Sequence, residues 1–195
     1  MNYLTLFNEI TSNIPPDNKP RLLLHACCAP CLSASLEMLV KHFRVDVFFF
    51  NPNISPREEF YKRENEVKRL LEIADFAENV TLFSPEYAPE AFAEAAKGFE
   101  NEPEGGARCE RCFRLRLHKT AEFAAQGGYD FFGTTLTISP HKNAEIINKI
   151  GFEAAEIYGV KALPLDLKKR EGYKRSTQLS KAFGLYRQNF CGCGL

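Results

Sequence analysis

Five short apolar runs recur along this chain, and segments of helical character separate most of them. The runs are Arg21–Ala26, Val45–Phe50, Val80–Phe83, Asp130–Thr135 and Val160–Leu165. Apolar runs of this length, without regular polar alternation, are typical of strands buried on both faces of a parallel sheet. Their alternation with helices therefore predicts an α/β fold with a mainly parallel, doubly wound sheet and helices on both faces.

The segments between the apolar runs supply the helices of this fold. Leu32–Phe43 has apolar residues at helical spacing, and Pro56–Ala77 is long, charged and opens on a proline suited to a first turn. Further helices are expected at Glu90–Lys97, Cys109–Ala125 and Pro140–Ile150, the last opening after Ser139. We expect residues 1–195 to form a single α/β domain in which residues 1–20 are an N-terminal extension.

The chain carries no recognisable targeting or membrane signal. Its first ten residues lack the basic start and long apolar core of a secretory signal. The longest strongly apolar run, Val45–Phe50, is too short to cross a bilayer. We therefore expect a cytoplasmic, reducing location without a membrane partner, in which thiols stay free for metal binding or catalysis.

Seven cysteines fall into three tight groups, with none left over. The groups are Cys27-Cys28-x-x-Cys31, Cys109-x-x-Cys112 and Cys191-x-Cys193. Such grouping is typical of metal sites built from several loops, and an odd total argues against a simple disulfide framework. The first group follows the first predicted strand, and α/β sheets bind ligands at the carboxyl ends of their strands. We therefore expect the cysteine cluster at that edge of the sheet.

Two thiolates from each of the first two groups can hold a [4Fe-4S] cluster. Structural zinc is the alternative, although its paired ligands are usually about two to four residues apart, unlike the adjacent Cys27 and Cys28. Cys31 is either a buried apolar side chain or a spare ligand for a second metal. His25, beside Cys27, is a candidate to orient a ligand from behind.

The third group suits redox chemistry. Gly192 gives the backbone freedom to close a very small disulfide ring between Cys191 and Cys193. A ring that tight is strained and readily reduced, which favours a shuttle over a structural bridge. We therefore interpret residues 185–195 as a C-terminal redox tail. The alternative is that these two cysteines supply further ligands to the same metal.

The net charge is zero, but its distribution is uneven. Residues 108–119 and 161–187 are basic and adjoin cysteine groups, whereas residues 72–104 are acidic. A positive face around the cysteines would attract a polyanion. Solvated helix faces are the alternative interpretation.

Motifs spread in order from about Arg21 to Cys193 resemble the epoxyqueuosine reductase QueH family. They are HACCAPC at His25–Cys31, NPNI at Asn51–Ile54, CERCFRLRL at Cys109–Leu117, TTLTISP at Thr134–Pro140, GYKRS at Gly172–Ser176 and YRQNFCGC at Tyr186–Cys193. The resemblance implies an oxidoreductase of tRNA processing in queuosine biosynthesis. Such an enzyme would reduce epoxyqueuosine at the tRNA wobble position to queuosine without cobalamin. An iron–sulfur cluster and a Rossmann-like, nucleotide-hydrolase-like fold are implied as well.

Carried onto this sequence, the resemblance assigns a role to each cysteine group. It places the cluster ligands at Cys27, Cys28, Cys109 and Cys112, and the redox-active pair at Cys191 and Cys193. It also allows an additional iron ion beside the cluster, with Cys31, the tail cysteines or Asp166 as candidate ligands. Removing an epoxide oxygen as water needs acids, for which the candidates are Asp166, Tyr173 and His25. The electron donor is unidentified.

The implied tRNA gives the basic segments a partner. The expected phosphate contacts are Arg111, Arg114, Arg116, Lys168, Lys169, Arg170, Lys174 and Arg175. Two rival functions remain at this stage. One is a zinc-stabilised RNA-binding protein without redox catalysis, its zinc held by the second and third cysteine groups. The other is an ATP-using tRNA-modifying enzyme, which should carry a phosphate loop where this chain has Cys27–Cys31.

Overall fold

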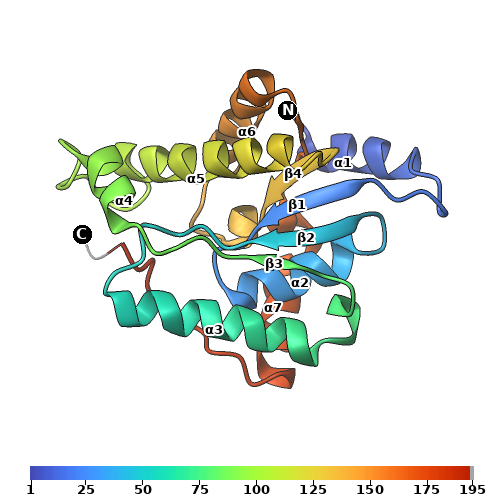
Figure 1. Ribbon diagram of the computed structural model, residues 1–195, viewed down its shortest axis with the longest axis horizontal. Helices are drawn as coiled ribbons and strands as arrows, with labels where there is room; N and C mark the ends of the chain where they lie inside the picture. The colour runs from blue at the N-terminus through green and yellow to red at the C-terminus, as the bar shows by residue number, and fades with distance from the viewer. Residues whose placement is uncertain (194–195) are drawn as a thin grey trace.

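A computed structural model describes residues 1–193 and shows one five-stranded sheet with the order β3-β2-β1-β4-β5 (Figure 1). The strands are β1 Arg21–His25, β2 Arg44–Phe48, β3 Leu82–Phe83, β4 Phe131–Thr134 and β5 Lys161–Ala162. Every neighbouring pair is parallel. The predicted fold class is therefore confirmed, and each apolar run contributes one strand.

Helices cover both faces of this sheet. They are α1 Tyr3–Ser12, α2 Ala29–Leu39, α3 Arg57–Ile73, α4 Pro89–Ala96, α5 Ala107–Gln126, α6 Ala144–Tyr158 and α7 Gly172–Ala182. Side chains alternate across the sheet, so Leu22 and Leu24 pack with α2, α3 and α7, whereas Leu23 packs with α5 and α6. Figure 1 shows α5 on one side of the strands and α2, α3 and α7 on the other.

Two helices lie outside the segments in which the sequence predicts helices. The N-terminal segment described above as an extension contains α1, which begins after Asn2 and buries Tyr3 and Phe7. Asn2 caps the helix by accepting hydrogen bonds from the backbone N–H groups of Leu4 and Thr5. The basic segment after β5 contains α7, which packs against α2.

The expected helix at Pro140–Ile150 is displaced towards the C-terminus, which corrects the prediction that it opens after Ser139. A 3-10 turn at Thr135–Ile138 and a loop precede α6. The side chain of Asn143 accepts from the N–H groups of Glu145 and Ile146 and so starts the helix. Gly159, with φ 68°, ends it.

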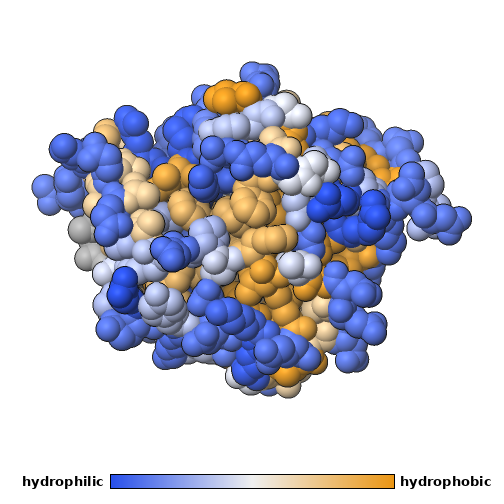
Figure 2. Space-filling model, in the orientation of Figure 1, coloured by the Kyte–Doolittle hydropathy of each residue, from blue (hydrophilic) through white to orange (hydrophobic). Residues whose placement is uncertain are grey.

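The surface view shows hydrophilic side chains over α3 and α5, with an apolar band between them (Figure 2). Among the described residues, no helix combines the length and the apolar composition needed to cross a membrane. The sheet brings the ends of β1, β2 and β4 together at one edge. That edge is where the first cysteine group begins.

Candidate metal and redox site

Three separate elements bring the cysteines to the carboxyl edge of the sheet. Cys27 and Cys28 lie in the turn between β1 and α2, and Cys28 is the residue immediately before the helix. Cys109 and Cys112 lie one turn apart at the start of α5. Cys191 and Cys193 lie after α7, in the last described part of the chain. All seven cysteines are free thiols.

The first group is compact. The sulfur atoms of Cys27, Cys28 and Cys31 lie within 4.8 Å of one another, close enough to share a metal ion. Hydrogen bonds from the Cys28 and Cys31 thiols hold the pKa of Cys27 well below its usual value. Donation to Cys27 raises the pKa of Cys28 to about 12. Cys27 is therefore the most readily deprotonated cysteine of this group, and a thiolate is the form in which cysteine binds metals.

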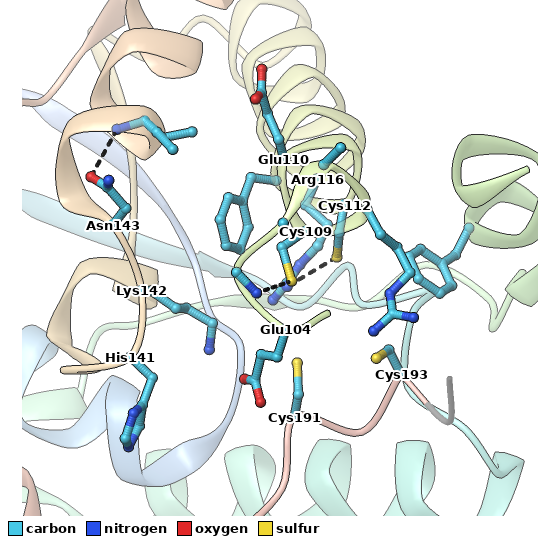
Figure 3. A pocket seen from close by; sticks show the side chains of 17 residues that line it. Glu104, Cys109, Glu110, Cys112, Arg116, His141, Lys142, Asn143, Cys191 and Cys193 are labelled. Carbon is cyan, nitrogen blue, oxygen red and sulfur yellow. Dashed lines mark hydrogen bonds between the residues drawn. The ribbon is translucent and has the colours of Figure 1, made fainter. Parts of the chain in front are cut away.

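Two adjoining cavities hold the three cysteine groups. The smaller, of about 340 Å³, is lined by Cys109, Cys112, Cys191 and Cys193 (Figure 3). The larger, of about 580 Å³, is lined by the whole first group and again by Cys191. The residues common to both cavities are Glu104, Arg116, His141, Lys142 and Cys191. Cys191 is thus the cysteine at the junction of the two cavities.

The loop that precedes α5 contacts Cys109, the first cysteine of the second group. The backbone N–H of Gly105 donates to the Cys109 sulfur at 3.2 Å. Burial raises the pKa of the Cys112 thiol, while the nearby Arg116 guanidinium acts in the opposite direction. In Figure 3 the sulfur atoms of this group and those of Cys191 and Cys193 border the same space.

The buried guanidinium of Arg116 lies between Cys112 and the ends of β1 and β2. Arg116 is only 2% exposed. It donates to the Cys112 sulfur at 3.7 Å, to the Asn51 side-chain oxygen at 2.7 Å and to the His25 ring at 3.4 Å. No carboxylate among residues 1–193 is within ion-pair distance of it. A buried charge needs a counter-charge, and the neighbouring sulfurs are the groups here that can supply one.

Lys142, which like Arg116 lines both cavities, is a second cation near the cysteines. Burial disfavours its charge, but the nearby sulfurs of Cys27, Cys191 and Cys31 favour that charge and outweigh burial, so the pKa of Lys142 is raised. Two cations therefore face the cysteine groups. This donor set of thiolates, surrounded by positive charge, fits an anionic metal–sulfide cluster.

A sequence profile of the epoxyqueuosine reductase QueH family matches residues 22–195. The chain belongs to this family. The family member of Staphylococcus epidermidis is 40% identical over 200 residues, which cover 99% of this chain and 83% of that protein. The member of Thermotoga maritima is 39% identical over 176 residues, covering 88% of each chain. The resemblance seen in the motifs is thereby confirmed.

In this QueH family member, His25 lies behind the site rather than in it. Its ring is fully buried, with Nδ1 2.9 Å from the Thr134 hydroxyl and Nε2 3.2 Å from the Phe50 carbonyl oxygen. Burial, followed by the charge of Arg116, lowers the pKa of His25 to about 3. Because it lines neither cavity, His25 supports Arg116 and is not placed to protonate a substrate.

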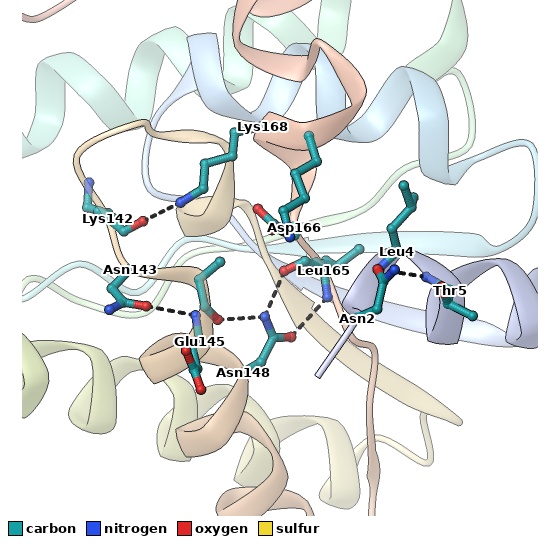
Figure 4. Close-up of polar contacts among 12 residues, drawn as sticks. Asn2, Leu4, Thr5, Lys142, Asn143, Glu145, Asn148, Leu165, Asp166 and Lys168 are labelled. Carbon is teal, nitrogen blue, oxygen red and sulfur yellow. Dashed lines mark hydrogen bonds and ion pairs between the residues drawn. The ribbon is translucent and has the colours of Figure 1, made fainter.

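Asp166 and Tyr173, the other two acids expected from the sequence, lie in different places relative to the cavities. Asp166, shown in Figure 4, lines neither cavity of the described chain. Its carboxylate lies 3.0 Å from the Lys169 ammonium. The predicted role of Asp166 as a metal ligand or proton donor therefore stays a prediction. Nearby, the Lys168 ammonium donates to the Lys142 backbone carbonyl at 2.8 Å and holds that loop. Tyr173, in contrast, lines the larger cavity and is 44% exposed.

Most of the expected phosphate contacts are engaged elsewhere in the molecule. Arg116 is buried, and ion pairs join Arg114 to Glu153, Lys169 to Asp166, Lys174 to Glu171 and Arg175 to Glu37. Arg111 lies over the Phe99 ring, and the Arg170 side chain lies outside the described residues. Many charges of the basic segments are therefore paired with carboxylates, some three positions away, as for Lys169 and Lys174, and some distant in sequence, as for Arg114 and Arg175.

Sequence reasoning missed two arginines of the site. Arg187 lines the larger cavity, donates to the Ser176 hydroxyl at 3.1 Å and lies over the Tyr173 ring. Arg63 lines the same cavity although it comes from the middle of α3. The only sequence signal for Arg187 was its place within the YRQNFCGC motif, and α3 offered none for Arg63.

Proposed function

We propose that this chain is an epoxyqueuosine reductase that acts on tRNA and converts epoxyqueuosine to queuosine. The reaction removes the epoxide oxygen as water and leaves a carbon–carbon double bond. The observation that carries the proposal is the convergence of three cysteine groups on two cavities that meet at Cys191. Membership of the QueH family gives the substrate. Free thiols of this kind suit the reducing cytoplasm.

Cys27, Cys28, Cys109 and Cys112 are the proposed ligands of a [4Fe-4S] cluster. Arg116 and Lys142 would then offset its negative charge. Cys31 lies within ligand distance of the first pair and is the candidate ligand for an additional iron ion. When bound, such a centre would pass electrons on within a low-dielectric site.

The proposed electron source within the chain is the Cys191–Cys193 pair. An epoxide that becomes an alkene and water takes up two electrons and two protons, which a dithiol releases when it becomes a disulfide. Epoxide plus dithiol therefore balances alkene, water and disulfide. Tyr173 is the candidate proton donor to the oxygen because it is the one expected acid that lines the substrate-sized cavity. An external reductant returns the disulfide to dithiol.

The larger cavity is the proposed site of the modified nucleoside. Its lining combines the first cysteine group with two exposed aromatic side chains, Tyr173 and Phe190. Exposed aromatic rings beside a cation are the usual means of holding unpaired RNA bases. Arg187, over the Tyr173 ring, supplies the cation. We therefore propose that anticodon-loop bases stack at this cavity.

Replacing Tyr173 by alanine should weaken tRNA binding about tenfold or more, because one stacking surface is lost. Arg187→Ala should also weaken binding and reduce the salt slope of the affinity by about one unit. Fluorescence anisotropy with tRNA across a salt series measures both effects. Tyr61→Ala is the matched control, since Tyr61 is 43% exposed but lines neither cavity. Equal losses in all three variants would contradict stacking at this cavity.

The function is tested by anaerobic purification, metal and sulfide analysis, and an assay on tRNA that contains epoxyqueuosine. We expect about four iron and four sulfide per chain, a reducible cluster signal and formation of queuosine. Stoichiometric zinc without sulfide, persisting after anaerobic cluster reconstitution, would instead favour the zinc-stabilised RNA-binding protein.

A further inference from the structure

One face of α3 contacts the chain that follows α7 at both of its ends, near Phe183 and near Cys191. Four charged residues spaced three or four apart make up this face, namely Glu59, Arg63, Glu66 and Arg69. Figure 1 shows the chain after α7 passing below α3 and ending beside the first turn of that helix. The segment thus runs antiparallel to α3. We call residues 183–193 the terminal segment.

The contacts begin at the far end of α3. The Arg69 guanidinium donates to the backbone carbonyls of Phe183 at 3.0 Å and Gly184 at 2.8 Å. One turn earlier, the Glu66 carboxylate accepts from the backbone N–H of Tyr186 at 2.7 Å. All three bonds go to backbone atoms of the segment, so they fix its path whatever its side chains are.

The contacts continue to the cysteine pair. Arg63 donates to the Cys191 carbonyl at 3.0 Å and, through Nε, to the Glu59 carboxylate at 2.6 Å. The backbone N–H of Ser55, just before α3, donates to the Gly192 carbonyl at 2.7 Å. Arg63 is 3% exposed, so this clamp is shielded from water. Hydrogen bonds to a buried charge are the stronger kind.

Gly192 fits against this clamp because it has no side chain. Its φ is 95°, a conformation that strongly favours glycine. A Cβ at this position would lie 2.7 Å from Arg63 Nη2. Close approach to Arg63 is therefore a second reason for glycine here, beside the freedom needed to close a disulfide.

We propose that Arg63, oriented by Glu59, is a positioning residue that holds the Cys191–Gly192–Cys193 backbone and so keeps Cys191 at the junction of the two cavities. The clamp is formed with the main-chain carbonyls of Cys191 and Gly192. Arginine is required because its fork reaches Glu59 and Cys191 with different nitrogens, which a lysine ammonium cannot reproduce in the same geometry. The proposed consequence for electron transfer rests on the proposed function, whereas docking of the segment does not.

Docking is tested by the alkylation rates of Cys191 and Cys193 in the native holoprotein, followed by peptide mass spectrometry. Arg63→Lys should raise both rates about tenfold or more, because the segment opens more often when a charged hydrogen bond is lost. Gly192→Ala should do the same while leaving α3 intact. Arg69→Ala removes the clamp at the far end of the same face and should have a clearly smaller effect on both cysteines.

Removing one member of a buried ion pair can unfold a protein. A variant that removes both charges is therefore tested beside Arg63→Lys and Gly192→Ala. Glu59→Gln/Arg63→Gln removes both charges together and leaves no unpaired ion in the interior. It should show the same faster alkylation with little change in melting temperature. Alkylation rates equal to those of the unaltered protein in both this variant and Gly192→Ala would overturn the proposal.

Turnover separates this inference from the proposed function. In the Arg63→Lys and Gly192→Ala proteins, conversion of epoxyqueuosine by pre-reduced enzyme should slow about tenfold while the iron and sulfide content stays near normal. A purely structural defect would lower both equally and would count against positioning. If the unaltered protein fails to reduce epoxyqueuosine but the variants still alkylate faster, the proposed function is wrong and the clamp stands.

Discussion

Replacing Cys191 and Cys193 by serine is expected to reduce repeated turnover of epoxyqueuosine tRNA by more than about a hundredfold. The reason is that the proposed dithiol is the chain's own source of two electrons, and serine cannot form a disulfide. Cys191 lines both cavities, so the pair lies next to the other cysteine groups. Queuosine formed under excess reductant, measured by nucleoside mass spectrometry, gives the rate.

The same variant separates this role from metal binding. If the pair acts as a shuttle, Cys191→Ser/Cys193→Ser keeps the iron and sulfide content of the unaltered protein and its affinity for tRNA. Because the two electrons of the dithiol are missing, pre-reduced variant enzyme should form much less than one queuosine per chain. Loss of iron would instead show that these cysteines are metal ligands, the alternative that the sequence left open. Full multiple-turnover activity would eliminate the shuttle.

Most of the fold could be predicted from local sequence patterns. Apolar runs such as Arg21–Ala26 and Val45–Phe50 became neighbouring strands because each must bury both faces, which only a covered parallel sheet permits. The position of Cys27 and Cys28 followed directly, since residues after a parallel strand reach its carboxyl edge. The spacing of Cys109 and Cys112 likewise sets them one helical turn apart.

Contacts between distant segments could not be predicted from the sequence. Asp166 looked available for chemistry, yet the fold leaves it outside both cavities. Arg175 looked available for phosphate, yet Glu37 binds it from α2. One sequence shows how many charges a segment has, but not which charges the fold pairs together.

For the same reason, the roles of Arg63 and Arg116 could not be predicted from the sequence. Arg63 and Cys191 are 128 positions apart in the chain, and Arg116 and Asn51 are 65 apart. Arg116 was expected on the surface because its helix is rich in arginine. The helix instead turns that side chain towards β1 and leaves Arg114 on the outer face, paired with Glu153.

Arg116→Met is expected to weaken retention of the metal centre by about tenfold to a hundredfold, the usual cost of losing a group that supports metal ligands. Methionine keeps much of the side-chain volume but removes the donor to the Cys112 sulfur and the positive charge among the thiolates. It also leaves the Asn51 side-chain oxygen, in a residue that is 1% exposed, without its guanidinium partner. Iron and sulfide per chain after anaerobic dialysis against a chelator measure the loss.

Arg114→Met is the matched control, because Arg114 lies on the same helix but makes partly exposed ion pairs with Glu153 and Glu110. Ion pairs near the surface contribute little, so this variant should keep its iron and its melting temperature. If Arg116→Met retains iron as well as Arg114→Met does, the cluster does not depend on a buried counter-charge. The guanidinium would then serve to hold Asn51 and His25 at the ends of β2 and β1.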